Sequence, residues 1–391
     1  MFARTWELMR TLGLEEDLKA IDGIQDMESK MAYYKSDQTP PILCGHAEHT
    51  MRSFHRAEFL KVLEDHVPSH YRKHFNKRLT SYEDSAQQPV LLHFKDGTTA
   101  QCDVLIGADG IKSAVRRSMF AQLTEKKGVA PQTYRWCMDA TWSGLVAYRG
   151  LVPTDTLKAQ CPNHMGLTSP VYYFGKDKSA ISYPISQGHM LNVAVMVYQP
   201  GTRGLPYEGP WVTAVDRAEF LDEIASWDSE VCSLFKDIHS PSKWAVNEVV
   251  GLPTFVSDRA AIMGDAAHAM MPLLASGASQ AVEDAIILAT VLAHSATQAD
   301  TIPHGLEIYD EIRRPFALHI QELSYLTGES IWLESMGLRH YTAEDSAAGR
   351  IPHAELVELV TKDQPDKFRW AWTTSLKGDQ DRAVEMLNSA V

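Results

Sequence analysis

Cysteine is scarce in this sequence, and long apolar runs are missing. The five cysteines, at positions 44, 102, 137, 161 and 232, stand apart, and none belongs to a Cys-x-x-Cys pair. This spacing argues against a zinc ribbon, a redox dithiol and a disulfide scaffold, and no metal site is expected. It predicts reduced thiols in a cytoplasmic protein. No stretch approaches the roughly 18 uninterrupted apolar residues of a membrane-spanning helix, so no membrane partner is expected.

Positive charge is also in short supply. The 37 Lys and Arg residues are outnumbered by 50 Asp and Glu residues, which gives a formal net charge of −13. Such a balance argues against a nucleic acid or an anionic membrane as a partner held by charge. Apolar residues make up 45% and charged residues 22% of the chain, as in ordinary globular proteins. The length of 391 residues predicts two or three domains, or one large α/β unit.

Short apolar runs bounded by turn residues predict the strands. Residues 103–108 and 259–263 are continuous apolar runs of strand length, which suit a parallel sheet buried on both faces. Residues 90–94 precede an Asp-Gly turn and predict a hairpin. Between about 140 and 200 the runs are rich in Val, Ile and Tyr and are broken by Gly and Pro. This texture predicts an antiparallel sheet that forms a second domain or an insertion into the first.

Helical spacing of apolar residues marks most of the remaining chain. From Ala278 onward the predicted apolar face comprises Val282, Ile286, Ala289 and Ala293. Residues 303–327 predict a second long helix, which Pro315 should kink or divide. Further helices are predicted over residues 1–12 (closed by Gly13), 56–65 (with Phe59, Leu60 and Leu63 inward), about 114–119 (capped by Ser113) and 211–227, and as short helices from 345.

Two strand-to-loop corners carry an acidic residue beside a glycine. Asp109 follows the 103–108 run, and Asp265 follows the 259–263 run. Ligands of α/β sheets gather at the carboxyl ends of strands. An Asp there can accept hydrogen bonds from ribose or ribitol hydroxyls, and a nearby helix N-terminus offers free N–H groups. The alternative is that each Asp only caps a turn or a helix, but two such corners favour a ligand.

Several segments, taken in chain order, together resemble one known family. They read FHRAEFL over 54–60, DVLIGADGIKSAVR over 103–116, VAYRG over 146–150, SYP over 182–184, and GDAAHAMMP over 264–272 followed by Gly277 and Glu283-Asp-Ala285. The combination resembles the flavoprotein monooxygenases of the salicylate hydroxylase and para-hydroxybenzoate hydroxylase type. The resemblance extends from Met1 to about Thr327.

The resemblance implies an α/β fold with a Rossmann-like FAD-binding domain and an antiparallel β-sheet substrate domain. The implied boundaries are 1–135 and 251–330 for the two parts of the FAD-binding domain, 136–250 for the substrate domain, and 331–391 for a C-terminal helical segment. It implies hydroxylation of a small phenolic or aromatic-acid substrate with FAD, NAD(P)H and O2, through a flavin hydroperoxide. A monomer or homodimer is expected.

The chain departs from the family pattern at two places. It has no G-x-G-x-x-G turn, and its Met1 helix resembles the segment that follows that turn. We therefore expect an FAD-binding domain that is incomplete at the N-terminus, lacking the first βαβ unit, with an uncovered groove beside 103–108 and weak FAD binding. At the flavin loop, Ala275 and Ser279 replace glycines, and Leu273 replaces a histidine. We interpret these replacements as tuning of the space around the flavin rather than as loss of flavin binding.

The resemblance also implies residue roles. Arg56 would contact the flavin side of the cofactor, Asp265 its ribitol chain, Ala278 the flavin through its backbone N–H, and Asp109 the pyrophosphate or the nicotinamide site. Arg149 and Tyr183 would be the catalytic pair, facing one pocket beside the 272–278 loop and orienting the ring. The structural alternatives are an edge salt bridge for Arg149 and a half-buried aromatic for Tyr183. His268 is expected to be structural, and Trp136, Trp142, Trp211 and Trp244 to lie in the core or a pocket wall.

Two other functions stay open at this point. One is epoxidation of an isoprenoid alkene by the same flavin chemistry. The other is a truncated, flavin-free relative that serves only as a binding protein, which the missing G-x-G-x-x-G supports and the intact Asp109 and Asp265 corners oppose.

Overall fold

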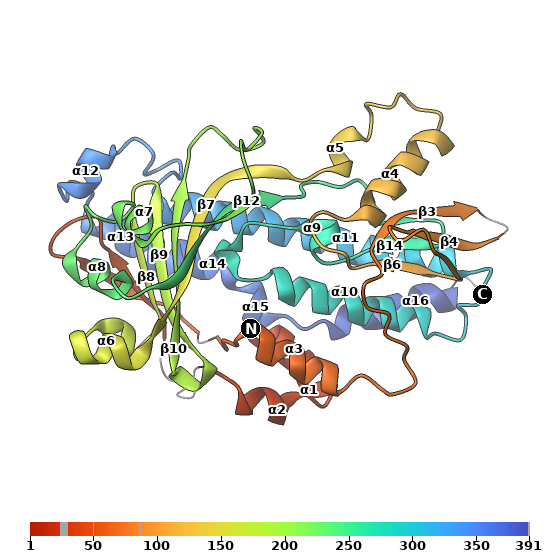
Figure 1. The fold of residues 1–391 in the computed structure, drawn as a ribbon, viewed down its shortest axis with the longest axis horizontal. Coiled ribbons are helices and arrows are strands. Elements are labelled where there is room, and N and C mark those ends of the chain that lie inside the picture. Colours follow the sequence, from red (N-terminus) through yellow and green to blue (C-terminus); the bar gives the residue numbers. More distant parts are fainter. Residues whose placement is uncertain (24–29, 50, 86–87, 390–391) are drawn as a thin grey trace. The chain divides into compact units, whose positions relative to one another are not determined.

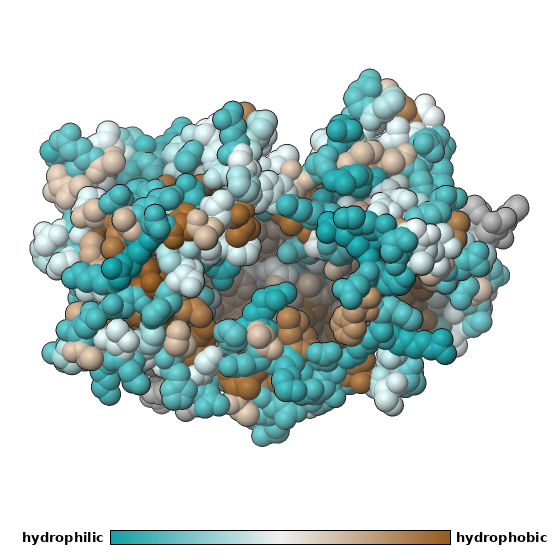
Figure 2. Space-filling model, in the orientation of Figure 1, coloured by the Kyte–Doolittle hydropathy of each residue, from teal (hydrophilic) through white to brown (hydrophobic). Residues whose placement is uncertain are grey.

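The computed structural model describes residues 1–23, 30–49, 51–85 and 88–389. The chain divides into two compact units, which are described separately. Unit 1 comprises residues 1–67, 142–246 and 326–373, and unit 2 comprises 68–141, 247–325 and 374–391. Across the described part of the chain, no helix is both long and apolar enough to cross a bilayer. Figure 2 shows hydrophilic side chains over much of the visible surface, with apolar ones scattered among them.

These units differ from the predicted domain boundaries at both ends of the chain. Residues 1–67, expected in the first cofactor-binding part, lie in unit 1, because β1 (Ala32–Lys35) joins the unit 1 sheet beside β8 (Val171–Gly175). The predicted C-terminal segment, 331–391, is divided between the two units. Its residues up to 373 lie in unit 1, whereas α16 (Lys377–Ser389) packs on α10 (Gly277–Leu292) in unit 2. Which unit binds which ligand stays a prediction.

Unit 1 is built on one large sheet with the strand order β11-β12-β7-β10-β9-β8-β1-β2. Figure 1 labels β7, β8, β9, β10 and β12 of this sheet. The neighbouring pairs β7–β10, β10–β9 and β9–β8 are antiparallel, as predicted. β1 pairs in parallel with β8. The remaining strands are β2 (Ile42–His46), β7 (Thr141–Pro153), β9 (Lys178–Ile185), β10 (Met190–Tyr198), β11 (Val212–Ala214) and β12 (His239–Glu248). Residues 211–227 are therefore not one helix, because Val212–Ala214 pairs with β12 and only α7 (Arg217–Asp222) is helical.

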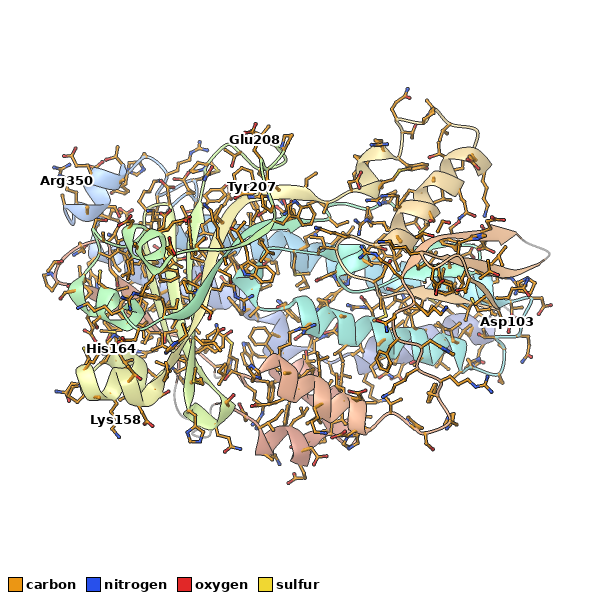
Figure 3. The ribbon with its side chains drawn as sticks, viewed as in Figure 1. Asp103, Lys158, His164, Tyr207, Glu208 and Arg350 are labelled. Atoms are coloured by element: carbon orange, nitrogen blue, oxygen red, sulfur yellow. The ribbon has the colours of Figure 1, made fainter. Side chains whose placement is uncertain are left out.

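Alternation along the strands gives this sheet two different faces. The first face carries Val146, Tyr148, Val193 and Val195, which pack against Phe220 and other apolar residues of α7 and α8 (Ser229–Phe235). His164, labelled near α6 in Figure 3, is buried in this unit: its Nδ1 accepts from the Gly166 N–H and its Nε2 lies 3.0 Å from the Glu230 oxygen. The second face carries the intervening residues, and it is where the predicted Arg149 and Tyr183 lie.

The helices of unit 1 form around an aromatic cluster and the sheet edges. Phe2, at the start of α1, packs edge-on against Phe368, Trp370 and Trp372. α3 has the predicted bounds, and Phe59 and Leu63 of its predicted inward face are half-buried. Leu60 is 44% exposed, so the prediction for this residue is wrong. The bounds are α1 (Ala3–Thr11), α2 (Glu15–Ala20), α3 (Arg56–Asp65), α6 (Thr154–Gln160), α12 (Ala343–Ala347), α13 (His353–Glu358), α14 (Gln364–Phe368) and α15 (Trp370–Thr373).

A half-buried carboxyl group at the β8–β9 turn makes the stability of unit 1 pH-dependent. Burial and the nearby Glu334 carboxylate raise the pKa of Asp177 to about 6, although Lys176 opposes the shift. The raised pKa means that this carboxyl stabilises the fold fully below pH about 4, and that this stability is lost as the pH rises toward 6.

Asp177→Asn should therefore stabilise the protein at pH 7.5 by roughly 1–3 kcal/mol and should flatten the pH dependence of stability. Asparagine also tolerates the positive φ of 60° at this position. The measurement is the urea-unfolding midpoint at pH 4.5 and 7.5. Equal declines in wild type and variant between these two pH values would show that Asp177 does not cause the effect.

Unit 2 contains two three-stranded sheets, ordered β13-β14-β6 and β3-β4-β5. β6 and β14 pair in parallel, with Ile262 opposite Gly107, which confirms the predicted parallel sheet. Lys95–Thr98 turns between β4 and β5, which confirms the predicted hairpin. The bounds are β3 (Leu79–Ser85), β4 (Gln88–Phe94), β5 (Thr99–Cys102), β6 (Leu105–Gly107), β13 (Val256–Ser257) and β14 (Ala260–Ile262).

The helices of unit 2 are longer than the sequence pattern predicts. Ser113 caps α4 (Ala114–Lys126) as predicted, but the helix continues well past Met119. α11 (Ile302–Ile331) passes through Pro315 without being divided, and its residues up to 325 belong to unit 2. The short helices are α5 (Arg135–Met138), where Trp136 is 52% exposed and not in the core, and α9 (Asp265–His268).

The predicted apolar face of α10 is wrong. Ala289 and Ala293 are exposed, and Val282 and Ile286 are only half-buried. The buried face instead comprises Ser279, Gln280, Glu283, Asp284, Ile287, Leu288 and Val291. Four of these residues are polar, and three of them, Gln280, Glu283 and Asp284, hydrogen-bond to one buried arginine of α11, which is described with the site below.

Candidate cofactor and substrate sites

Asp109 and Asp265 follow neighbouring parallel strands at the same edge of the unit 2 sheet. Asp109 comes two residues after β6 and Asp265 three residues after β14. Arg116 connects the two corners: it is buried, and its guanidinium donates to the Ala266 oxygen at 2.9 Å and to the Ile111 oxygen at 2.6 Å. The two corners singled out in the sequence therefore form one local structure.

The Gly264-Asp265 corner leaves a carboxylate available to a ligand. Gly264 has φ 57° and ψ −141°, a conformation that only glycine adopts readily, and a Cβ there would lie 3.1 Å from the Ala281 methyl group. Asp265 is exposed, and within the described residues nothing hydrogen-bonds or pairs with its carboxylate. This group can accept hydrogen bonds from ligand hydroxyls.

The N-terminus of α10 is likewise free of protein caps. The N-cap residue Ser276 donates its hydroxyl to the Leu274 oxygen at 2.7 Å and does not cap the helix. Ala278 is exposed in the first turn, so its N–H can reach an electron-rich ligand atom. Ala275 has φ 49°, a left-handed conformation that glycine would adopt at lower cost. The loop therefore makes a turn that favours glycine, although alanine is the residue present.

A buried polar network supports this corner from behind. The Asp284 carboxylate receives the Gly264 N–H at 3.0 Å and lies 2.6 Å from His268 Nε2 and 2.9 Å from Arg313 Nε. Arg313 also bonds Glu283 at 2.9 Å and the Gln280 side chain at 2.7 Å, and none of the three charged groups is exposed. Burial opposes ionisation of Asp284, but His268 and Arg313 outweigh it and hold its pKa at about 2.

His268 is thus structural, as predicted. The role predicted for Asp109 competes with a structural one, because its Oδ2 accepts the N–H groups of Ala114 at 2.7 Å and Val115 at 3.2 Å. It caps α4 together with Ser113, and only its other carboxylate oxygen is left for a ligand. The weaker of the two corner predictions is the one for Asp109.

In unit 1, Arg149 and Tyr183 lie on the second face of the sheet, on strands that flank β10. Arg149 of β7 is opposite Ala194 and Tyr183 of β9 is opposite Asn192, so their strands are about 10 Å apart. Arg149 is exposed, and its guanidinium lies 5.8 Å from the ring centroid of Trp244. No carboxylate among the described residues pairs with it, so the edge salt bridge considered above does not form.

Tyr183 is half-buried and is electrostatically linked to Arg149. Burial raises the pKa of its phenol, while the Arg149 charge and the polar Asn192 side chain lower it. The register against β10 places both residues on the same face of the sheet. Whether they face the 272–278 loop stays a prediction, since that loop belongs to unit 2.

Arg56 and the remaining tryptophans complete the predicted residues. Arg56 is the first residue of α3 in unit 1, where it is exposed and has no partner within the described ranges. Trp142 is buried as expected, whereas Trp244 is 41% exposed, with the Arg149 guanidinium 5.8 Å from its ring centroid. The structure thus places Asp109, Asp265 and Ala278 in unit 2, and Arg56, Arg149 and Tyr183 in unit 1.

Sequence reasoning missed two sets of residues. The first is the Arg313 network, for which the only signal was the polar residues Glu283 and Asp284 within an apolar helix. The second is Asn192, the only amide in the otherwise apolar strand MLNVAVMVY. A lone polar residue in the middle of a buried strand needs a partner, and this rule would have drawn attention to Asn192.

The residues of unit 2 fit an FAD cofactor on its flavin side. The free Asp265 carboxylate suits the hydroxyls of the ribitol chain, and the uncapped α10 N-terminus suits the flavin ring. β6 is at the edge of its described sheet, and the expectation of a groove beside it stays a prediction.

Comparison with known proteins agrees with this geometry. A family described as "FAD binding domain" matches residues 1–144 and 176–324. A salicylate hydroxylase of Pseudomonas putida is 34% identical over 334 residues, covering 84% of this chain and 70% of that protein. An FAD-dependent monooxygenase of Strobilurus tenacellus is 30% identical over 390 residues, covering 91% of this chain and 80% of that one.

A solved structure titled "Salicylate hydroxylase substrate complex" superposes with a TM-score of 0.82 at 28% identity, covering 98% of this chain and 89% of that one. The named relatives are hydroxylases and monooxygenases, which does not favour an epoxidase or a non-catalytic relative. The chain therefore belongs to the FAD-binding monooxygenase family of the salicylate hydroxylase type, as an oxidoreductase whose cofactors are FAD and NAD(P)H.

Proposed function

We propose that this enzyme hydroxylates a small phenol or aromatic acid that binds as an anion on the second face of the unit 1 sheet. The observation that carries the proposal is the arrangement of Arg149 and Tyr183 on this face, with no described carboxylate on the guanidinium. In a chain with a net charge of −13, an anionic ring needs such a local cation. The salicylate hydroxylase relatives support the same substrate class.

The residues of this face have complementary roles in the proposal. Arg149 binds a carboxylate or phenolate oxygen, bidentately in the former case. Tyr183 holds a proton at its phenolic oxygen, because burial raises its pKa. The half-buried Ile181 and Leu151 lie on the same face and contact the ring, which displaces water from it.

In unit 2 we assign Asp265 to the ribitol chain, Ala278 to the flavin ring through its N–H, and Asp109 to the pyrophosphate or nicotinamide end. Arg56 of unit 1 is assigned to the flavin side. When bound, FAD would supply electron transfer from NAD(P)H to dioxygen and the insertion of one oxygen atom at a ring carbon as a hydroxyl group, while the other oxygen atom leaves as water. The protein's part is to orient the ring for that insertion.

Arg149→Ala tests the substrate role. Loss of a charge-assisted contact should weaken binding of an aromatic acid about 10- to 100-fold and should lower product formation far more than flavin content. Electrons from NAD(P)H should then yield hydrogen peroxide in place of product. The measurement is the product formed per NAD(P)H consumed, with Tyr183→Phe as the second variant.

Lys243→Ala is the matched control, since Lys243 is a cation of the same sheet whose side chain faces Tyr148 and Glu219 on the first face. It should leave coupling unchanged. Wild-type coupling in both Arg149→Ala and Tyr183→Phe would return these residues to purely structural roles.

A further inference from the structure

One hydrogen bond joins the helix that begins at Arg56 to the turn that follows Tyr183, here called the turn after β9 (residues 184–187). The Ser186 hydroxyl of this turn donates to the Glu58 carboxylate of α3 at 3.0 Å. Residues two positions apart project from different sides of a helix, so Glu58 contacts the turn while Arg56 stays exposed. The bond therefore fixes α3 without using the side chain that we assign to the cofactor.

Further contacts hold the same turn from segments near the start of the chain. The Ser53 hydroxyl donates to the Pro184 oxygen at 2.6 Å, and the Gln187 side-chain amide donates to the Ala20 oxygen at 2.9 Å. Gly23 packs so closely that a Cβ there would clash with the Pro184 oxygen. Together with the bond to α3, three hydrogen bonds thus attach the turn to segments more than 100 residues away in the chain.

The backbone of the turn after β9 is strained. Ser186 and Gln187 have φ values of 49° and 56°, a left-handed conformation that non-glycine residues seldom adopt twice in succession. Glycine would adopt these angles at lower cost, yet both positions carry side chains, and each side chain makes one of the bonds described above. Strain that persists because surrounding contacts maintain it is typical of functional sites.

We propose that Glu58 and Ser186 are positioning residues that hold Arg56 at a fixed place relative to Tyr183, so that the ring is aligned for hydroxylation. The inference rests on the proposed function, which assigns Arg56 to the flavin side of the cofactor and Tyr183 to the ring. Without the bond, α3 can shift against β9. A misplacement of about 1 Å can lower a reaction rate by about 100-fold, so the loss should fall on alignment rather than on ligand binding.

The main test is Ser186→Gly, because this change removes the hydroxyl and at the same time relieves the left-handed backbone. We expect the melting temperature of the ligand-free protein to equal or exceed that of wild type. In the FAD-loaded enzyme with salicylate, we expect the product formed per NAD(P)H consumed to fall about 3- to 30-fold. The dissociation constants for FAD and salicylate, measured by titration calorimetry, should stay near the wild-type values.

Variants of Glu58 test the other partner of the bond. Glu58→Ala should lower coupling as much as Ser186→Gly does, and the variant with both substitutions should show no further loss, because each change removes the same bond. Glu58→Gln keeps an acceptor oxygen for the Ser186 hydroxyl and should recover coupling. Asp65→Ala is the control, since Asp65 is a carboxylate of the same helix that pairs with Lys61, with both side chains more than half exposed.

Three results would overturn the inference: wild-type coupling in both Ser186→Gly and Glu58→Ala, a melting temperature of Ser186→Gly that falls together with its coupling, or a double variant that loses more coupling than either single variant. Failure of the wild-type enzyme to hydroxylate salicylate or any other aromatic acid is a different result, because it overturns the proposed function itself and the inference with it.

Discussion

Arg313→Met is expected to destabilise the protein by about 3–5 kcal/mol. The Arg313 guanidinium is fully buried and pairs with two buried carboxylates, of Glu283 and Asp284, each at 2.9 Å. Methionine has a similar volume but no charge, so both carboxylates would lose their shared cation in an environment without water. The loss of two ion pairs at once is the reason for the large effect.

The measurement is the free energy of unfolding by urea, with Arg382→Met as the control. Arg382 also pairs with a carboxylate, that of Glu311 at 2.7 Å, but both side chains are more than half exposed. Such surface pairs contribute about 0–1 kcal/mol, so the control should remain close to wild type. A loss no larger in Arg313→Met than in Arg382→Met would contradict the role of the network.

Asp265→Ala is expected to weaken FAD binding about 10- to 100-fold, because a charge-assisted hydrogen bond contributes roughly 1.5–3 kcal/mol. The Asp265 carboxylate is exposed and is not bonded by any described residue. Its removal therefore costs the fold little, and the loss should be confined to the ligand. Gly264, whose N–H bonds Asp284, should keep the corner in place.

The measurement is a fluorescence titration with FAD, with a thermal melt of the ligand-free protein as a folding check. Asp103→Ala is the control, since Asp103 is an exposed carboxylate just before β6, at the opposite end of the sheet from the two corners (Figure 3). An Asp265→Ala variant that binds FAD as tightly as Asp103→Ala would contradict the assignment.

The strands were predictable because each is a local pattern. The 103–108 and 259–263 runs are apolar throughout, as a strand buried on both faces requires, and they form the parallel pair β6 and β14. The Asp-Gly turn after residue 94 likewise carries its own hairpin signal. The antiparallel sheet followed from residue type and turn spacing alone.

The α10 face was not predictable from the helix itself. Its inward residues Glu283 and Asp284 are buried because Arg313, about 30 residues later in the chain, neutralises them. A period of apolar residues cannot reveal a partner on another helix. Asp109 was ambiguous for a related reason, since the same carboxylate can cap α4 or bind a ligand, and capping appears only once the helix is in place.

Isotopically labelled dioxygen tests most directly whether this enzyme places one oxygen atom of dioxygen on a ring carbon of an anionic aromatic substrate. The purified protein is supplied with FAD, NAD(P)H and either salicylate or another phenolic acid. We expect the ring to accelerate NAD(P)H oxidation and the hydroxylated product to carry one labelled oxygen atom. NAD(P)H oxidation that no aromatic acid accelerates, with no label in any product, would contradict the claim.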